Sequence, residues 1–501
     1  MHAVSRIITL FSAKSPPYLL AIALGAVAVL GFAPFYLFPL PILALTGLFV
    51  LWQKTNSPKA TFKLGFAFGL GLYIVGIYWI YISLHDYGGM PWWFAGFCTF
   101  CLCAFMALFP ALAGYFSKRI GILWLSAPVL WGVSDWVRSW IFTGFPWLTL
   151  GYSQVPHSPL AGFAPIVGIY GVSVLAALIA ALVAAWVTKP NVAYKRNSIA
   201  VITLLLVIGY VLKVVEWTSP SGKPLQAVLL QGNIPQDIKW SPDNAQHTID
   251  TYLHMVQQSR APLIVLPETA LPVIASQLDV GTKEALAAHA KRNQGGIIVG
   301  MVEYTDDSNE YFNSALCFGC PLVTTYRKNH LVPFGEFIPL KQAFGWIYRD
   351  WLNIPLSDLS RGGAIQPSMK IVDQKIAMNI CYEDVFGEEI ARNNKNSTLM
   401  INISNDAWYG QSYAAHQHLQ FSQARALENG RTMLRSTNTG ATAAIDQHGY
   451  VLAHAPHDTQ TTLDVTVQGF IGITPYQRWG NWPFILLSFA AIAFVISRKT
   501  L

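Results

Sequence analysis

The sequence predicts a polytopic α-helical membrane domain with eight spans and an α/β domain outside the bilayer. The chain has 501 residues, of which 53% are hydrophobic and 12% are charged, whereas an average soluble domain is about 25% charged. The charge deficit is confined to residues 1–218 and a short closing stretch, while residues 225–475 have an ordinary globular composition. We therefore expect a seven-span domain at 1–218, a soluble domain at 219–478 and a final span at 479–501.

Eight apolar stretches approach the length of about 20 residues that a membrane-spanning helix needs. They lie at 18–34, 38–53, 64–83, 91–115, 121–141, 162–188, 198–215 and 482–497. Asp135 and Arg138 stand one helical turn apart near the outer end of the fifth stretch, where a neutralised ion pair is the simplest interpretation. A transporter or channel would need ionisable residues deep in the spans, so this pair at an edge disfavours that function.

The positive residues predict the orientation of the spans. With the N-terminus in the cytoplasm, the cytoplasmic segments hold twelve Lys and Arg residues and no Asp or Glu. The formal net charge of +7 is therefore a topology signal, because a nucleic-acid-binding protein would carry its basic residues on the soluble domain. In a bacterium, both termini would lie in the cytoplasm and the soluble domain on the periplasmic face of the inner membrane.

Strands and helices alternate along the soluble domain. Apolar runs predict strands at 227–233, 263–269, 295–304, 311–318, 322–328, 376–383, 398–406, 433–446 and 451–456. Helices are predicted at 243–260, 282–292, 386–394 and 412–429. We expect layered sheets under helices, with some antiparallel strand pairing.

Two of the six cysteines form the sequence Cys317-Phe-Gly-Cys320. A zinc or redox site would need a second cysteine pair or a histidine pair at metal-ligand spacing, and the sequence offers neither. We interpret the two as strand residues or as a facultative disulfide, and we predict no metal or cofactor.

Cys381 ends the apolar run IAMNI and is followed at once by Tyr-Glu-Asp. Such a thiol is a candidate nucleophile if a neighbour takes its proton, although a lone cysteine is more often a packing residue. Glu268 and Lys328 also end apolar runs, at the strand tips where α/β folds place their sites. Glu and Lys are rarely buried unpaired, so we expect the two to meet.

These residues and their flanks resemble a known family. Glu268 in LPET, Lys328 in YRKNHLVPFGEF and Cys381 in ICYED are similar to the Glu-Lys-Cys triad of the nitrilase superfamily. More closely they resemble its membrane branch, the bacterial apolipoprotein N-acyltransferases, as do TGFPWLTLGYSQ, QGNIPQ, SNDAWYG and RSTNTG. The resemblance implies a nitrilase-like α-β-β-α sandwich for the soluble domain.

The resemblance also implies a two-step reaction. Cys381 would attack the sn-1 ester of a phospholipid, typically phosphatidylethanolamine, and the resulting thioester would acylate the α-amino group of a diacylglyceryl-cysteine at a lipoprotein N-terminus. Glu268 would be the general base. Lys328 would stabilise the oxyanion and lower the pKa of the thiol, and Glu336 would orient both partners.

The resemblance assigns four further residues to the substrate site. Tyr382 and Glu383 would lie beside the nucleophile, and Trp240 and Trp408 would line the substrate pocket, although a core role suits the two tryptophans equally. The protein is expected to act as a monomer on the phospholipid donor and the apolipoprotein acceptor.

The same triad would also serve a second enzyme class, so the triad alone does not distinguish an acyltransferase from that class. A membrane-anchored nitrilase-type amidase would use water as the second acceptor. A soluble amide needs no bilayer, so the seven-span platform favours the acyltransferase.

The loop at 337–363 is too apolar for a solvated loop of its length. Long loops of this kind are often functional lids. We expect it to be a mobile arm that dips into the outer leaflet and admits the two lipid substrates in turn.

Overall fold

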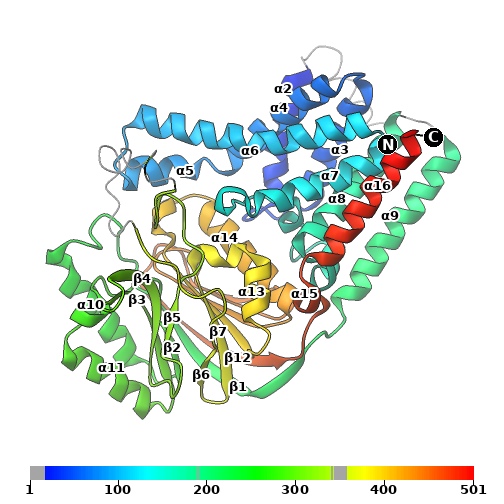
Figure 1. Cartoon of the computed structure of the whole chain (residues 1–501). Helices are drawn as coiled ribbons and strands as arrows, with labels where there is room; N and C mark the ends of the chain where they lie inside the picture. The colour runs from blue at the N-terminus through cyan, green and yellow to red at the C-terminus, as the bar shows by residue number, and fades with distance from the viewer. Residues whose placement is uncertain (1–16, 189–190, 340–341, 343–357, 501) are drawn as a thin grey trace. The chain divides into compact units, whose positions relative to one another are not determined.

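The computed structural model describes residues 17–188, 191–339, 342 and 358–500. The chain divides into two compact units, whose helices and strands are labelled in Figure 1. The helical unit comprises Met1–Ile80, Trp93–Val215 and Trp479–Leu501, and the α/β unit comprises Tyr81–Trp92 and Glu216–Arg478.

The helical unit is built from long apolar helices. They are α2 (Pro17–Ala28), α3 (Pro39–Lys54), α4 (Pro58–Gly76), α6 (Trp92–Ile120), α7 (Leu123–Arg138), α8 (Ala164–Thr188), α9 (Val192–Lys213) and α16 (Trp482–Thr500). Among the described residues, three helices are long and apolar enough to cross a membrane, or four if the bent pair Pro58–Gly76 and Trp79–Tyr87 forms one span. The predicted count of eight is therefore not confirmed, because several of the apolar helices are shorter than a full crossing.

The predicted ion pair in this unit is confirmed. Arg138 Nη2 lies 2.7 Å from Asp135 Oδ1, and both side chains are buried. Arg138 Nη1 also donates to the carbonyls of Phe145 and Trp147, at 3.1 and 2.8 Å. Asp135 Oδ2 accepts from Leu150 N at 3.1 Å. The pair therefore neutralises itself and fixes the irregular segment that follows α7.

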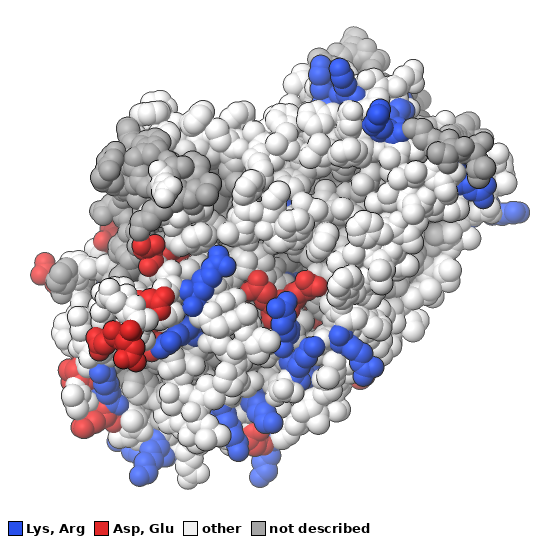
Figure 2. Space-filling model, in the orientation of Figure 1, with Lys and Arg blue, Asp and Glu red and all other residues white. Residues whose placement is uncertain are grey.

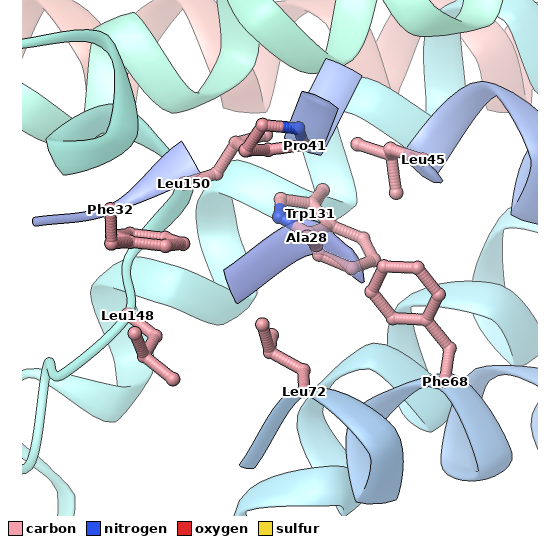
Figure 3. Close-up of a pocket in the computed structure, with 9 residues that line it drawn as sticks. All are labelled: Ala28, Phe32, Pro41, Leu45, Phe68, Leu72, Trp131, Leu148 and Leu150. Atoms are coloured by element: carbon pink, nitrogen blue, oxygen red, sulfur yellow. The ribbon is translucent and has the colours of Figure 1, made fainter. Parts of the chain in front are cut away.

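A small apolar cavity lies among α2, α3, α4 and α7 (Figure 3). It is lined by Ala28, Phe32, Pro41, Leu45, Phe68, Leu72, Trp131, Leu148 and Leu150. The volume open to the centre of a water molecule is about 10 Å³, which is the space of a single water. An acyl chain does not fit, so this cavity is a packing gap and not a lipid site.

Two six-stranded sheets form the centre of the α/β unit. The first has the order β12 (Thr461–Ile471), β1 (Ser219–Gln231), β2 (Leu263–Val265), β3 (Gly296–Thr305), β4 (Glu310–Phe318), β5 (Thr325–Arg327). The second has the order β11 (Val451–His454), β10 (Ala443–Ile445), β9 (Met433–Thr437), β8 (Leu399–Ser404), β7 (Gln374–Ile380), β6 (Met369–Ile371). β1, β2 and β3 run parallel, as do β7, β8 and β9, and the outer pairings are antiparallel.

Helices cover the outer face of each sheet (Figure 1). α10 (Pro242–Gln258) and α11 (Val280–Arg292) share one apolar core with the first sheet. α13 (Gly387–Asn393) and α14 (Ala414–Asn429) share another with the second. Ser436 Oγ on β9 donates to the carbonyls of Leu230 and Val265, at 3.0 and 3.2 Å, and so joins the two sheets. The layers are helix, sheet, sheet and helix, which confirms the predicted layered α/β domain.

Cys317 and Cys320 form a disulfide at the end of β4. Cys317 lies in the strand, and its N–H donates to the carbonyl of Thr324 at 2.7 Å. Both sulfurs are buried, with residue exposures of 6% and 9%. The disulfide interpretation is therefore confirmed, and the strand interpretation holds for Cys317 alone, because β4 ends at Phe318 before Cys320.

Candidate active site

In the α/β unit, Glu268 and Lys328 follow strands of the first sheet and lie close to Cys381, which follows a strand of the second. Lys328 Nζ lies 3.3 Å from Glu268 Oε1, and the charges of both residues act on the buried thiol of Cys381. The three residues are 6%, 1% and 7% exposed. A thiol, a carboxylate and an ammonium group are thus held together away from bulk water.

Each residue stands just after a strand. Lys328 follows β5, and Cys381 opens a short 3₁₀ turn, η7 (Cys381–Val385), directly after β7. Cys381 has φ of 53°, a left-handed conformation that costs free energy for a residue with a side chain. β2 ends at Val265, earlier than the predicted strand 263–269, because Pro267 has no N–H to donate to the ladder. Glu268 therefore lies on a turn beyond the strand.

A buried amide joins the two carboxylates of the site. Asn313 Nδ2 donates to Glu268 Oε1 at 2.7 Å and to Glu336 Oε1 at 2.8 Å. Lys328 Nζ donates to the same Glu336 oxygen at 2.9 Å. The second oxygen of Glu268 accepts from Asn405 N at 2.9 Å. These contacts fix the orientation of Glu268 and Lys328 before any substrate binds.

The charges of this cluster favour an ionised pair beside a neutral thiol. Burial raises the pKa of Glu268, but Lys328 and the Asn313 hydrogen bond outweigh it and leave that pKa below its ordinary value. Burial lowers the pKa of Lys328, but Glu336 and Glu268 outweigh it and leave that pKa well above its ordinary value. Glu268 is therefore ready to accept a proton.

Lys328 lowers the pKa of the Cys381 thiol, as predicted, but the net shift of that pKa is upward. Burial and the negative charge of Glu268 both raise the pKa of Cys381, and together they outweigh Lys328. Cys381 therefore rests as a neutral thiol, and a nucleophilic role for it would require a base that takes the proton as the sulfur attacks.

The comparisons with known proteins cover both units. The family model described as apolipoprotein N-acyltransferase N-terminal domain matches residues 24–182, and the carbon-nitrogen hydrolase model matches residues 227–476. An apolipoprotein N-acyltransferase of Nitrosomonas europaea is 47% identical, over 96% of this chain and 98% of its own. Proteins of the same name from Chromobacterium violaceum and Ralstonia nicotianae are 44% and 41% identical, over 93% and 95% of this chain and 91% and 92% of theirs.

The chain belongs to the apolipoprotein N-acyltransferase family. Two solved structures have weaker likeness to it: the NitFhit protein of C. elegans and a carbon-nitrogen hydrolase of Helicobacter pylori G27. They are 15% and 16% identical, cover 50% and 53% of this chain and 61% and 95% of their own, and each has a TM-score of 0.37. The family assignment rests on the full-length sequence relatives.

Glu383 is enclosed by hydrogen-bond donors in this member of the apolipoprotein N-acyltransferase family. Oε1 accepts from Asn329 N at 2.7 Å and from His330 N at 3.1 Å. Oε2 accepts from Ile380 N at 2.7 Å and from Tyr326 OH at 2.9 Å. The carboxylate thus ties the backbone before Cys381 to the segment after Lys328, and these four contacts occupy its acceptor positions.

The three aromatic candidates lie in different settings. Tyr382 is buried and packs on Phe386, with ring centroids 5.1 Å apart. Trp408 is partly exposed, its ring lies 6.4 Å from that of Tyr87, and its carbonyl accepts from Ser83 Oγ at 2.7 Å. Trp240 is also partly exposed and adjoins a buried lysine.

That neighbour, Lys239, is one of the residues that sequence reasoning did not assign to the site. Its Nζ donates to Thr269 Oγ1 at 2.7 Å and to the carbonyl of Glu268 at 3.3 Å. Burial lowers its pKa to about 8, against the opposing effects of Glu268 and Cys381. Asn313 was missed as well, although an amide within the apolar run YFNSALCF was a usable signal.

Most of the loop that was predicted to be a mobile arm is not described by the structure, so that role stays a prediction. Of the loop 337–363, residues 340–341 and 343–357 lie outside the described part of the chain. At the start of the loop, Glu336 accepts from Val332 N at 2.8 Å through its second oxygen. The loop thus departs from a residue that is itself part of the catalytic cluster.

Proposed function

We propose that this N-acyltransferase moves the sn-1 acyl chain of a phospholipid, through a thioester on Cys381, to the α-amino group of a diacylglyceryl-cysteine at a lipoprotein N-terminus. The observation that carries the proposal is the burial of a neutral thiol together with the ion pair of Glu268 and Lys328, whose charges act on it. Full-length relatives that are named apolipoprotein N-acyltransferase support the same reaction.

In the first half-reaction, Glu268 takes the thiol proton as Cys381 Sγ attacks the ester carbonyl of the phospholipid. The carbonyl π electrons move to oxygen, and Lys328 stabilises the resulting oxyanion. Collapse of the tetrahedral intermediate breaks the ester C–O bond, and Glu268 returns its proton to the departing lysophospholipid oxygen. The products are an acyl thioester and a neutral lysophospholipid hydroxyl.

In the second half-reaction, the acceptor must arrive as an amine. Glu268 takes a proton from its ammonium group, and the free amine attacks the thioester carbonyl. Glu268 passes this first proton to water and takes the second proton from the attacking nitrogen. The second tetrahedral intermediate expels the Cys381 thiolate, which Glu268 protonates with that second proton, and the nitrogen keeps the acyl chain as a neutral amide. One proton of the ammonium group is thus released to solvent and the other ends on the thiol. The enzyme therefore returns to its thiol and carboxylate state in a ping-pong cycle.

The surrounding residues divide into positioning and substrate-binding groups. Glu336 orients Lys328, as the 2.9 Å contact between them supports. The four donors around Glu383 favour a positioning role for it over the substrate contact expected from the resemblance. Tyr382, Trp240 and Trp408 remain proposed contacts to the lipid substrates.

The proposed setting is the inner membrane of a bacterium, with eight spans, both termini in the cytoplasm and the soluble domain, 219–478, on the periplasmic side. Figure 2 supports this orientation, since the visible face of the helical unit is nearly free of charge except for Lys and Arg at one end. The Cys317–Cys320 disulfide also supports it, because disulfides persist in oxidising compartments such as the periplasm.

The loop 337–363 is proposed to be a mobile arm that enters the outer leaflet and admits the phospholipid donor and the apolipoprotein acceptor in turn. Its apolar content and its departure from Glu336 support this role. Replacing Phe344, Trp346 and Trp351 with serine should slow acyl-enzyme formation. An unchanged rate in phospholipid vesicles would contradict the proposal.

The transfer reaction is tested with purified protein, phosphatidylethanolamine and a synthetic peptide that begins with diacylglyceryl-cysteine. We expect one N-acylated peptide for each lysophospholipid released, measured by mass spectrometry, and neither product from Cys381→Ala. Release of free fatty acid with no acylated peptide would contradict the proposal, because it would identify water as the acceptor.

A further inference from the structure

A buried cluster of four charged residues contacts the backbone carbonyl of Cys381. His418 on α14 stands between Asp384 on η7 and Asp406 on η8 (Asp406–Tyr409), and Arg435 on β9 contacts both carboxylates. The four side chains have no exposed surface. The proposed reaction assigns no role to any of them.

Three acceptors surround the imidazole of His418. Nδ1 lies 3.0 Å from Asp406 Oδ1, and Nε2 lies 3.0 Å from Asp384 Oδ1 and 3.2 Å from the carbonyl of Cys381. A neutral imidazole has only one N–H and would leave one of its nitrogens facing acceptors without a proton. The geometry therefore requires the imidazolium, which donates on both sides.

The charges balance around this imidazolium. Arg435 Nη1 lies 3.0 Å from Asp384 Oδ2, and Nη2 lies 3.1 Å from Asp406 Oδ2. Two cations and two anions thus share one buried site, as buried charges require. Burial and Arg435 lower the pKa of His418, but the two carboxylates outweigh them and raise it to about 9. Tyr409 is a further titratable neighbour, with its ring 6.5 Å from the imidazole.

The carbonyl of Cys381 is the point where this cluster reaches the reaction. It accepts from His418 Nε2 at 3.2 Å and from Asn402 Nδ2 at 3.1 Å. A left-handed backbone at a residue with a side chain persists only where its surroundings hold it in place. On the other side of His418, Asp406 follows Asn405, whose N–H holds the general base Glu268.

We propose that His418 is a positioning residue for the acyl transfer, which holds the strained Cys381 backbone by donating from Nε2 to its carbonyl while Nδ1 anchors the loop that orients Glu268. The inference rests on the proposed function, because it assigns a role within the same thioester reaction. Its distinctive prediction is that the two nitrogens of His418 are not equivalent for the chemistry.

Two substitutions separate the nitrogens. His418→Gln places an amide near the position of Nε2 and can keep the contact to Cys381. His418→Asn places its amide near Nδ1, so it keeps the contact to Asp406 and loses the one to Cys381. His289→Asn is the matched control, because His289 is also a buried helical histidine but bonds the carbonyl of Ser259 on the outer side of the first sheet, at 2.9 Å.

The measurement is the single-turnover rate of Cys381 acylation by phosphatidylethanolamine in detergent micelles, followed by intact mass, together with the melting temperature of each variant. We expect His418→Asn to acylate on the order of 10- to 100-fold more slowly than wild type, His418→Gln to be intermediate, and His289→Asn to match wild type. Equal rates for His418→Asn and His418→Gln, or rates that simply follow melting temperature, would overturn the inference.

Failure of the proposed function gives a different result, because wild type would then form no acyl-enzyme. If neither His418 variant folds, the pH dependence of acylation in Asp384→Asn tests the inference instead. This substitution keeps the side-chain volume but removes a negative charge that favours the imidazolium. The loss of acylation at alkaline pH should then begin about one pH unit lower than in wild type. An alkaline limb at the wild-type position would overturn the inference.

Discussion

Asn313 is one of the groups that set the pKa of Glu268, after burial and Lys328. Its amide donates to Glu268 Oε1 at 2.7 Å, and this bond helps to keep the pKa of Glu268 below its ordinary value. The depressed pKa means that the carboxylate is available as a base above that pKa and is lost as pH falls through it. Removing the amide should therefore move this loss to higher pH.

Asn313→Leu tests this effect. We expect the acid limb of the Cys381 acylation rate to shift upward, by about one to two pH units for the loss of a hydrogen bond to a charged group. Ser314→Ala is the matched control, because Ser314 is on the same strand and donates to Glu303, outside the site, at 3.1 Å. An acid limb that stays in place in Asn313→Leu would show that the amide does not tune the base.

The residues that could be predicted at this scale were those with a local signal. Glu268, Lys328 and Cys381 each follow an apolar run, and the structure brings them together with Glu336. Asn313 and the His418 cluster depend on distant segments that fold onto the site. No local spacing encodes such contacts, so a single sequence does not reveal their partners.

At the scale of elements, the turn after β7 is held by Glu383. Its carboxylate accepts from three backbone N–H groups and from Tyr326 OH. This single side chain therefore fixes the spacing between the nucleophile turn and the segment that carries Lys328.

Glu383→Gln should break this arrangement. The new NH₂ group would face donors in place of acceptors, and each unsatisfied buried group costs about 1–3 kcal/mol. We expect a lower melting temperature and a loss of Cys381 acylation, compared with Glu284→Gln on the exposed face of α11. Acylation and melting equal to those of Glu284→Gln would contradict the positioning role.

Element types were easier to predict than element lengths. The alternation of apolar runs and amphipathic helices indicated the layered sheets, because burial of one face imposes a period on the sequence. The strand 263–269 stopped early at Pro267, and several apolar helices are too short to establish a crossing by themselves. The missing N–H of Pro267 ended the strand, and the short length of the helices left the number of crossings unconfirmed. Neither feature can be read from composition.

At the scale of the whole molecule, the cysteines offer a test of the proposed side of the membrane. Cys317 and Cys320 are joined, while Cys98, Cys101, Cys103 and Cys381 are free. In protein isolated from membranes and denatured under an acidic quench, we expect maleimide to add two more labels after reduction than before. Equal labelling before and after reduction would indicate a reducing compartment and would contradict the periplasmic placement.

Cys381 is proposed to carry the acyl chain, and a direct test is the intact mass of the protein after exposure to phosphatidylethanolamine with no acceptor present. We expect wild type to gain the mass of one acyl chain, the gain to disappear on treatment with hydroxylamine, and Cys381→Ala to gain nothing. An equal gain in Cys381→Ala, or no gain in wild type while lysophospholipid is released, would contradict the thioester mechanism.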